Sequence, residues 1–365
     1  MLEAASTISV IICAYTEERW NDLVAAVESL QLQHCPPCEI IVVIDHNPSL
    51  LERAQKDIPG IIVLENKAQR GLSGARNSGV AIAHGTYIAF FDDDVIAEPD
   101  CLAWLQQYCA DAQVSGVGGK SEPLWSERQP TWFPEEFYWV IGCSYRGLPE
   151  TRAAIRNPFG CCCCFRREVF EVVGGFRHEI GRVGKHPLGC EETELCIRAK
   201  QHWPQHSFMY EPRARIQHRI PVYRTSWHYF CSRCYAEGLS KAMIAQYVGA
   251  QDALASERSY VRRTLPLGIV RGLRDALIHH DGTGLGRAGA IAVGLTTAMA
   301  GYLVGNATLR LAKLRSVITD KKGLPRYSET PPSILFEPRD ENEYVYNAPV
   351  SVQAMQGEEA HEAHE

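Results

Sequence analysis

A chain of 365 residues, 45% of them hydrophobic and 22% charged, has the composition of a soluble globular protein with one large domain or two ordinary ones. Its net charge of -6 gives no electrostatic reason to expect nucleic acid as a main partner. The first residues, MLEAASTISVIICAY, have no basic start before a long apolar stretch. We therefore expect no secretion signal, a cytoplasmic location and reduced cysteines.

Apolar runs alternate with helical patterns over the first third of the chain. Strand-like runs occupy residues 9–15, 39–45 and 60–66, and a fourth at 86–94 ends in three acids. Because these runs lack polar alternation and are separated by helical patterns, they predict a parallel sheet covered by helices on both faces. Such sheets bind ligands at the carboxyl ends of their strands, where Tyr15, Asp45 and the three acids lie.

The middle of the chain contains an aromatic segment and a run of four cysteines. Residues 123–158 are rich in Trp, Pro and Tyr without a clean period, and we interpret them as an ordered loop or lid over the sheet. FGCCCCF, at 159–165, cannot converge on one metal ion if it is a strand, because adjacent side chains point to opposite faces. We predict that FGCCCCFRREVF is a buried strand in which the cysteines serve as small side chains, with palmitoylation as a minor alternative.

The last third of the chain changes character. Residues 218–248 are a strand end followed by a long helix, and residues 260–280 are basic and amphipathic, as interfacial helices are. Residues 288–309 carry no charge and would span a bilayer by length, although a buried helix or one in the membrane surface fits equally well. We divide the chain into a catalytic domain at 1–250, a helical extension at 251–320 and a disordered acidic tail at 321–365.

Two acidic clusters are candidates for chemistry. Asp92, Asp93 and Asp94 would repel one another unless a cation is bound, and oxygen ligands in this number suit Mg²⁺ or Mn²⁺. Glu191 and Glu192 begin a helix, where acids are expected from the helix dipole alone, but where a general base would also be well held. His218, at a strand end, is on these grounds either a metal ligand or a core histidine.

Several motifs together resemble the family-two glycosyltransferases of the GT-A fold. They are SVIICAYTEER, IIVVID, GLSGARNSGVAIAHGTYIAFFDDD, the GGF turn and GCEETELCIR, in the family's order, and they cover about residues 9–248. The resemblance implies a doubly wound, mostly parallel GT-A sheet, a nucleotide-sugar donor and a Mg²⁺ or Mn²⁺ cofactor. It implies metal ligands at Asp94, Asp92 and His218, and a catalytic base at Glu192 or its neighbour Glu191. It implies donor contacts from Ala14, Tyr15, Glu17, Asp45, Gly71, Arg76, Asp92, Asp93 and Arg224.

A narrower match concerns the acceptor. WFPEEFYWVIGCSYRGLP and EGLSKA look like the branch containing archaeal hexuronosyltransferases that extend lipid-linked glycans. We therefore expect an inverting transfer from a UDP-sugar, with UDP-glucuronate as the candidate donor in that branch, to a hydroxyl of a lipid-linked or cell-envelope glycan. The cytoplasmic face of the membrane is the expected location. A sugar nucleotidyltransferase and a silent nucleotide-sugar-binding scaffold are the alternatives, although CAYTEER lacks the glycine-rich phosphate loop expected of the former.

Overall fold

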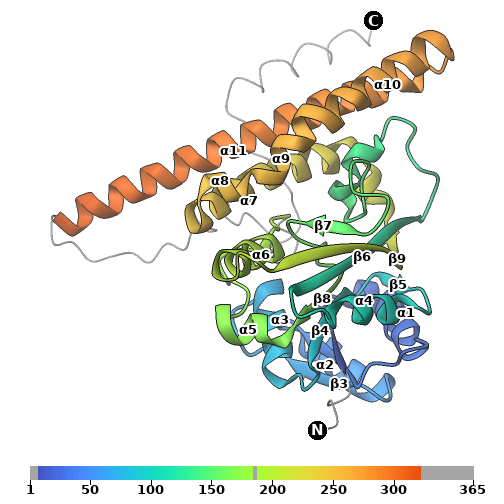
Figure 1. The fold of residues 1–365 in the computed structure, drawn as a ribbon, viewed down its shortest axis with the longest axis vertical. Coiled ribbons are helices and arrows are strands. Elements are labelled where there is room, and N and C mark those ends of the chain that lie inside the picture. Colours follow the sequence, from blue (N-terminus) through green and yellow to red (C-terminus); the bar gives the residue numbers. More distant parts are fainter. Residues whose placement is uncertain (1–6, 184–186, 322–365) are drawn as a thin grey trace, which may run out of the picture. The chain divides into compact units, whose positions relative to one another are not determined.

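The computed structural model describes residues 7–183 and 187–321, with side chains up to residue 314 (Figure 1). These residues belong to one compact unit. The tail expected at 321–365 lies, from residue 322 on, outside the described residues.

The amino-terminal half of the sheet is parallel, as the apolar runs predict. Its strands are β1 (Ile8–Ala14), β2 (Glu39–Ile44), β3 (Ile62–Glu65) and β4 (Tyr87–Asp92), in the order β3-β2-β1-β4. In β1, Val10 and Ile12 face one core and Ile11 faces the other, so the strand is apolar on both sides. All carboxyl ends of these strands therefore lie at one edge of the sheet.

The sheet continues through mixed pairings. Beyond β4 come β8 (Cys162–Arg166), β6 (Val114–Trp125), β9 (Ser207–Ile220) and β5 (Val95–Ala97), and β7 (Ala153–Ile155) pairs with β9. β8 is antiparallel to both of its neighbours, whereas β6 and β9 run parallel. The sequence analysis had not identified β6, which has two glycine-containing irregularities in its register and no clean apolar period.

Helices cover both faces of the sheet. One face carries α1 (Trp20–Gln31), α2 (Pro48–Asp57) and α4 (Cys101–Cys109). The opposite face carries α3 (Leu72–Ile82), α5 (Arg167–Val173) and α6 (Glu191–His202). Because α5 begins at Arg167, the strand expected from FGCCCCFRREVF is wrong in its second half.

Three of the four cysteines lie on the buried strand β8, as predicted, and Cys161 lies in the turn just before it. Cys162 and Cys164 pack into the core beneath α1, α2 and α4, while Cys163 packs into the core on the opposite face. Of these four residues, Cys161 alone lines the cleft described below. The other three are covered, because helices lie on both faces of β8.

The aromatic segment forms a third core instead of a lid. The 3₁₀ turn Glu135–Ile141 contributes Phe137, and with Phe133 it packs against Phe230 of α7 (Trp227–Val248) and Ile291 of α11 (Thr283–Lys321). Between these helices lie α8 (Ala250–Ala253), α9 (Ala255–Ser259), the π-helical turn Tyr260–Thr264 and α10 (Leu265–Ile278). The uncharged stretch 288–309 is thus the central part of a longer helix (Figure 1).

Helices α7 and α11 touch through glycine. A Cβ on Gly238 would lie 2.1 Å from the carbonyl oxygen of Ala298, and one on Gly301 would lie 2.1 Å from that of Tyr235. Only glycine permits backbones to approach this closely. The contact fixes α11 along the helix that also contributes to the cleft.

Candidate active site

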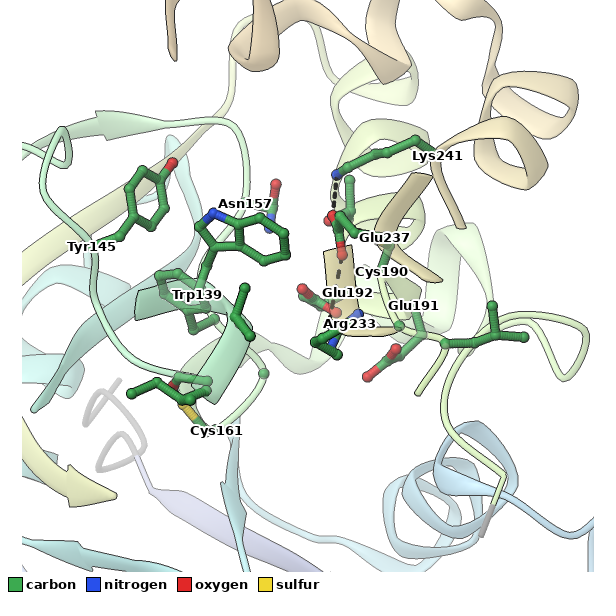
Figure 2. Close-up of a pocket in the computed structure, with 18 of the residues that line it drawn as sticks. Trp139, Tyr145, Asn157, Cys161, Cys190, Glu191, Glu192, Arg233, Glu237 and Lys241 are labelled. Carbon is green, nitrogen blue, oxygen red and sulfur yellow. Dashed lines mark hydrogen bonds and ion pairs between the residues drawn. The ribbon is translucent and has the colours of Figure 1, made fainter. Parts of the chain in front are cut away.

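A cleft of about 840 Å³ begins at the carboxyl ends of β1, β2 and β4 and extends to the C-terminal helices. Figure 2 shows Glu191 and Glu192 in it, with Trp139 and Tyr145 across from them. Most of the predicted residues line it: Ala14, Tyr15, Asp45, Arg76, Asp92, Asp93, Asp94, Glu191, Glu192, His218 and Arg224.

Two predicted donor contacts are not part of the wall. Glu17 is exposed, and its carboxylate lies 4.0 Å from the guanidinium of Arg53 on α2. Gly71 precedes α3 with a φ of +128°, and its backbone N–H donates to the carboxylate of Asp45 at 2.9 Å. The same carboxylate accepts from Asn66 at 2.6 Å. Asp45 thus holds the loop before α3 at the edge of the cleft.

Asp92, Asp94 and His218 form a possible metal site. One ligand atom from each lies within 4.8 Å of the others. Asp92 is half-buried and Asp94 is buried, and Oδ1 of Asp94 has no aligned hydrogen-bond donor although His218 Nε2 is 3.0 Å away. Two carboxylates and an imidazole suit Mn²⁺ or Mg²⁺, so these residues fit a divalent cation.

Three cationic side chains surround Asp94. Its carboxylate lies 3.1 Å from Arg19, 3.3 Å from Arg224 and 3.0 Å from His218. Burial opposes ionisation, but these neighbours outweigh it and hold the pKa of Asp94 well below its usual range. At Asp93, burial prevails over the 2.6 Å contact with Arg19, and the pKa is raised. Arg19, which lies within TEER, was not identified from the sequence.

Arg76 joins the two acidic clusters. It comes from α3 and is buried, with its guanidinium 2.8 Å from Glu191 and 3.6 Å from Asp92. It also donates to the carbonyl oxygen of Gly160, just before β8. Arg76 thereby places a positive charge between the possible metal site and the start of α6.

The three acids at the start of α6 differ in their partners. Glu191 is paired with Arg76, and Glu194 is buried between Arg177 and Arg198. Glu192 lines the cleft and forms no ion pair within the part of the chain that the structure describes. Burial, reinforced by Glu191 and opposed by Arg76, raises the pKa of Glu192 to about 8.

A half-buried ionic network forms the far wall of the cleft. Glu257 of α9 pairs with Arg156 at 2.6 Å and with Lys241 of α7 at 2.9 Å. Lys241 also lies 3.3 Å from Glu237, which faces Arg233 (Figure 2). The sequence analysis missed these residues, although Glu237 and Lys241 are the charged positions of EGLSKA, four residues apart on one helix face.

Comparison with known proteins shows the family. Residues 9–174 match the family described as glycosyl transferase family 2. The chain is 33% identical, over 273 residues, to a protein of Haloferax volcanii named glucosyl-dolichyl phosphate glucuronosyltransferase. That similarity covers 73% of this chain and 86% of the relative. The succinoglycan biosynthesis protein ExoM of Rhizobium meliloti is 24% identical over 63% of this chain and 72% of its own.

A solved structure supports the same fold. A mannosyltransferase of Pyrobaculum calidifontis, in complex with GDP-Man and Mn²⁺, has a TM-score of 0.51 at 15% identity, covering 81% of this chain and 88% of that one. At this identity the likeness concerns the fold alone. The parallel sheet, its helices on both faces and the family match agree with the expected GT-A architecture. The chain is a glycosyltransferase and belongs to glycosyl transferase family 2.

Proposed function

We propose that the chain transfers a hexuronosyl group, in the first instance glucuronosyl, from a UDP-sugar to a sugar hydroxyl of a lipid-linked saccharide. The observation that carries this is the similarity, over most of both chains, to a relative named for glucuronosyl transfer to glucosyl-dolichyl phosphate. The cleft-facing Glu192 supports a hydroxyl acceptor, because attack by an ionised phosphate oxygen would need no base.

Asp92, Asp94 and His218 would hold Mn²⁺ or Mg²⁺, which supplies neutralisation of the diphosphate's negative charge. Arg76 and Arg224 add fixed positive charge on either side of this cluster, where charge develops on the leaving diphosphate. Both guanidiniums are buried, so they act in a region from which water is largely excluded.

The proposed step is a single displacement with inversion at the anomeric carbon. The acceptor oxygen forms a bond to the anomeric carbon as the bond from that carbon to the diphosphate oxygen breaks. Glu192 takes the hydroxyl proton, and the nucleoside diphosphate leaves with the bonding electron pair. Glu191 does not fit the role of base as well, since its carboxylate is held by Arg76 at 2.8 Å.

Membrane association is proposed for the C-terminal helices. α11 contains the stretch Thr283–Leu314, 32 residues long, in which an 18-residue window has a mean hydropathy of 1.5, so it is long and apolar enough to cross a bilayer. The same stretch packs on α7 through Gly301 and contributes the buried Ile291 to the third core. Because one side of α11 is packed against the protein, we propose that it lies on the membrane surface and does not cross the membrane. We place the enzyme at the cytoplasmic face.

The test is nucleoside diphosphate release from a panel of UDP-, GDP- and dTDP-sugars, with Mn²⁺ or Mg²⁺ and glucosyl polyprenyl phosphate as acceptor. We expect release from UDP-glucuronate that requires both the metal and the acceptor. Asp92→Asn should lower the rate of nucleoside diphosphate release about a hundredfold or more. This is the usual effect of removing one group that stabilises charge developing in the transition state. Asp57→Asn, an exposed acid on α2, is the matched control.

Three results would contradict the proposal. They are release of pyrophosphate, full activity without a divalent cation, and transfer to polyprenyl phosphate that carries no sugar. Release from a different donor would correct the sugar while leaving the reaction class in place.

A further inference from the structure

The end of the cleft farthest from the sheet opens along an apolar edge. Met299 and Leu303 of α11 line the cleft, yet their side chains are 55% and 65% exposed. Val261, in the π-helical turn Tyr260–Thr264, is likewise both exposed and part of the lining. The cleft therefore reaches solvent between α11 and the turn Tyr260–Thr264. Both elements are far along the chain from the polar residues at the strand ends.

Backbone contact with α7 fixes the α11 side of this opening. Gly301, which lies between Met299 and Leu303, touches the backbone of α7 so closely that no Cβ fits. Gly238 of α7 makes the reciprocal contact with Ala298. Its neighbour in sequence is Glu237, a residue of the cleft's ionic wall. The apolar edge and the ionic wall are thus parts of one rigid helix pair.

Hydrogen bonds and ion pairs fix the opposite side. The hydroxyl of Tyr260 donates to the carbonyl oxygen of Glu136 at 2.5 Å and accepts from Trp139 Nε1 at 3.0 Å. A short distance earlier in the chain, Glu257 pairs with Arg156 and Lys241. The turn that carries Val261 is therefore anchored to the catalytic part of the molecule at two points.

Outside the opening, the apolar surface continues over α10 and α11. Exposed arginines, including Arg262, Arg263 and Arg274, accompany it, which is the pattern of a surface that meets anionic lipid headgroups. The large exposed apolar side chains there are Leu267, Val270, Leu273, Leu277, Ile278, Leu285, Val293, Met299, Leu303, Val304, Leu311 and Leu314.

We propose that the lipid chain of the acceptor lies in this opening, between Met299 and Leu303 on one side and the turn at Val261 on the other. The inference rests on the proposed function and adds to it the direction in which the acceptor enters. The saccharide reaches Glu192 while the chain remains in contact with α11 and passes out to the membrane. Continuity of one cleft from Glu192 to the exposed Leu303 carries the argument.

The experiment compares methyl, decyl and polyprenyl esters of glucosyl phosphate as acceptors, in detergent solution without a bilayer. In the unmodified enzyme the acceptor KM should fall at least tenfold from the methyl to the decyl ester. Leu303→Asp should abolish that gain and leave the KM for the methyl ester unchanged. Leu277→Asp is the matched control, because Leu277 is 75% exposed on α10 and does not line the cleft.

Equal losses in both variants would overturn the inference, because Leu277 does not line the cleft. Equal KM values for methyl and decyl esters in the unmodified enzyme would overturn it as well. If no ester accepts a sugar, the proposed acceptor class fails. The proposed position of the lipid chain is then tested by measuring the binding of a dansylated decyl glucosyl phosphate. Binding that Leu303→Asp abolishes supports this position, and absence of binding to the unmodified protein overturns it.

Discussion

The two ends of the cleft are built differently. At the sheet end, charged side chains follow directly after strands, and Asp92, Asp93 and Asp94 come from one continuous motif. At the helical end, Trp139, Lys241, Tyr260 and Leu303 come from segments far apart in the chain. Under the proposed function, the sheet end would hold the charged donor and the helical end would hold the acceptor.

The two ends of the cleft are also stabilised by different interactions. Buried charges at the sheet end are compensated by partners in neighbouring elements, such as Arg76 with Glu191. The helical end has ion pairs too, such as Lys241 with Glu257, but it is held in addition by aromatic packing and by backbone contact, such as Gly301 against α7. We expect single substitutions at the sheet end to abolish chemistry or folding, and those at the helical end to alter acceptor use.

Substitution of Glu192 should have the largest effect on transfer. Glu192→Gln should lower transfer by about 10²–10⁴-fold, the usual contribution of a general base. Donor affinity, measured by calorimetry, and the melting temperature at pH 5 should stay near those of the unmodified enzyme. Glu191→Gln is the matched variant, and it should lower the melting temperature because it removes the partner of Arg76. Substantial turnover in Glu192→Gln would exclude it as the base.

Arg76 tests whether the sheet end depends on buried charge compensation. Arg76→Met leaves Glu191 buried without a partner, which should cost about 3–5 kcal/mol in the free energy of unfolding. Urea unfolding measures this. The double variant Arg76→Met/Glu191→Met should recover most of the loss, because both charges are then removed. A double variant as unstable as the single one would show that the pair is not the source of the effect.

The pH dependence separates the chemistry of Glu192 from its effect on stability. With a pKa of about 8, transfer should rise about tenfold per unit as pH approaches 8 from below and then level off. Because the folded pKa lies above the ordinary value of 4.5, the folded state holds this proton more tightly. The contribution of Glu192 to stability is therefore full at low pH and is lost as pH rises through about 8.

The pH dependence of stability and the pH dependence of the transfer rate can each be checked separately. Glu192→Gln should remove the fall in stability between pH 5 and 8, measured by thermal unfolding, since glutamine does not titrate. A rate profile of the unmodified enzyme that is flat over the same range would contradict a base with a raised pKa.

The smallest expected effect concerns the helical end. Gly301→Ala places a Cβ 2.1 Å from the carbonyl oxygen of Tyr235, and the resulting separation of α11 from α7 should cost about 1–3 kcal/mol. Gly289→Ala, in the same helix with no atom within 4 Å, should be neutral or stabilising by up to about 1 kcal/mol. Similar unfolding curves for both variants would mean that the glycine contact does not hold α11.

Much of the sheet end could be predicted from the sequence. Apolar periodicity identifies β1, β2 and β4 within about a residue or two, and it places the acids at their ends. The buried strand of cysteines followed from the same alternation of faces. The strand β6 and the helix α5 were missed or misassigned, because their local patterns are weak and tertiary packing decides them.

Local patterns determined which residue types stand at the ends of strands and at the start of α6, because periods of two and 3.6 residues are properties of neighbouring positions. Only the tertiary structure decided that Arg76 pairs with Glu191, 115 positions away, and so leaves Glu192 without an ion pair among the described residues. It also decided that Gly238 meets α11 and that the cleft opens at Leu303. Contacts between distant segments depend on how the elements pack, and the local patterns of a sequence do not show which segments will meet.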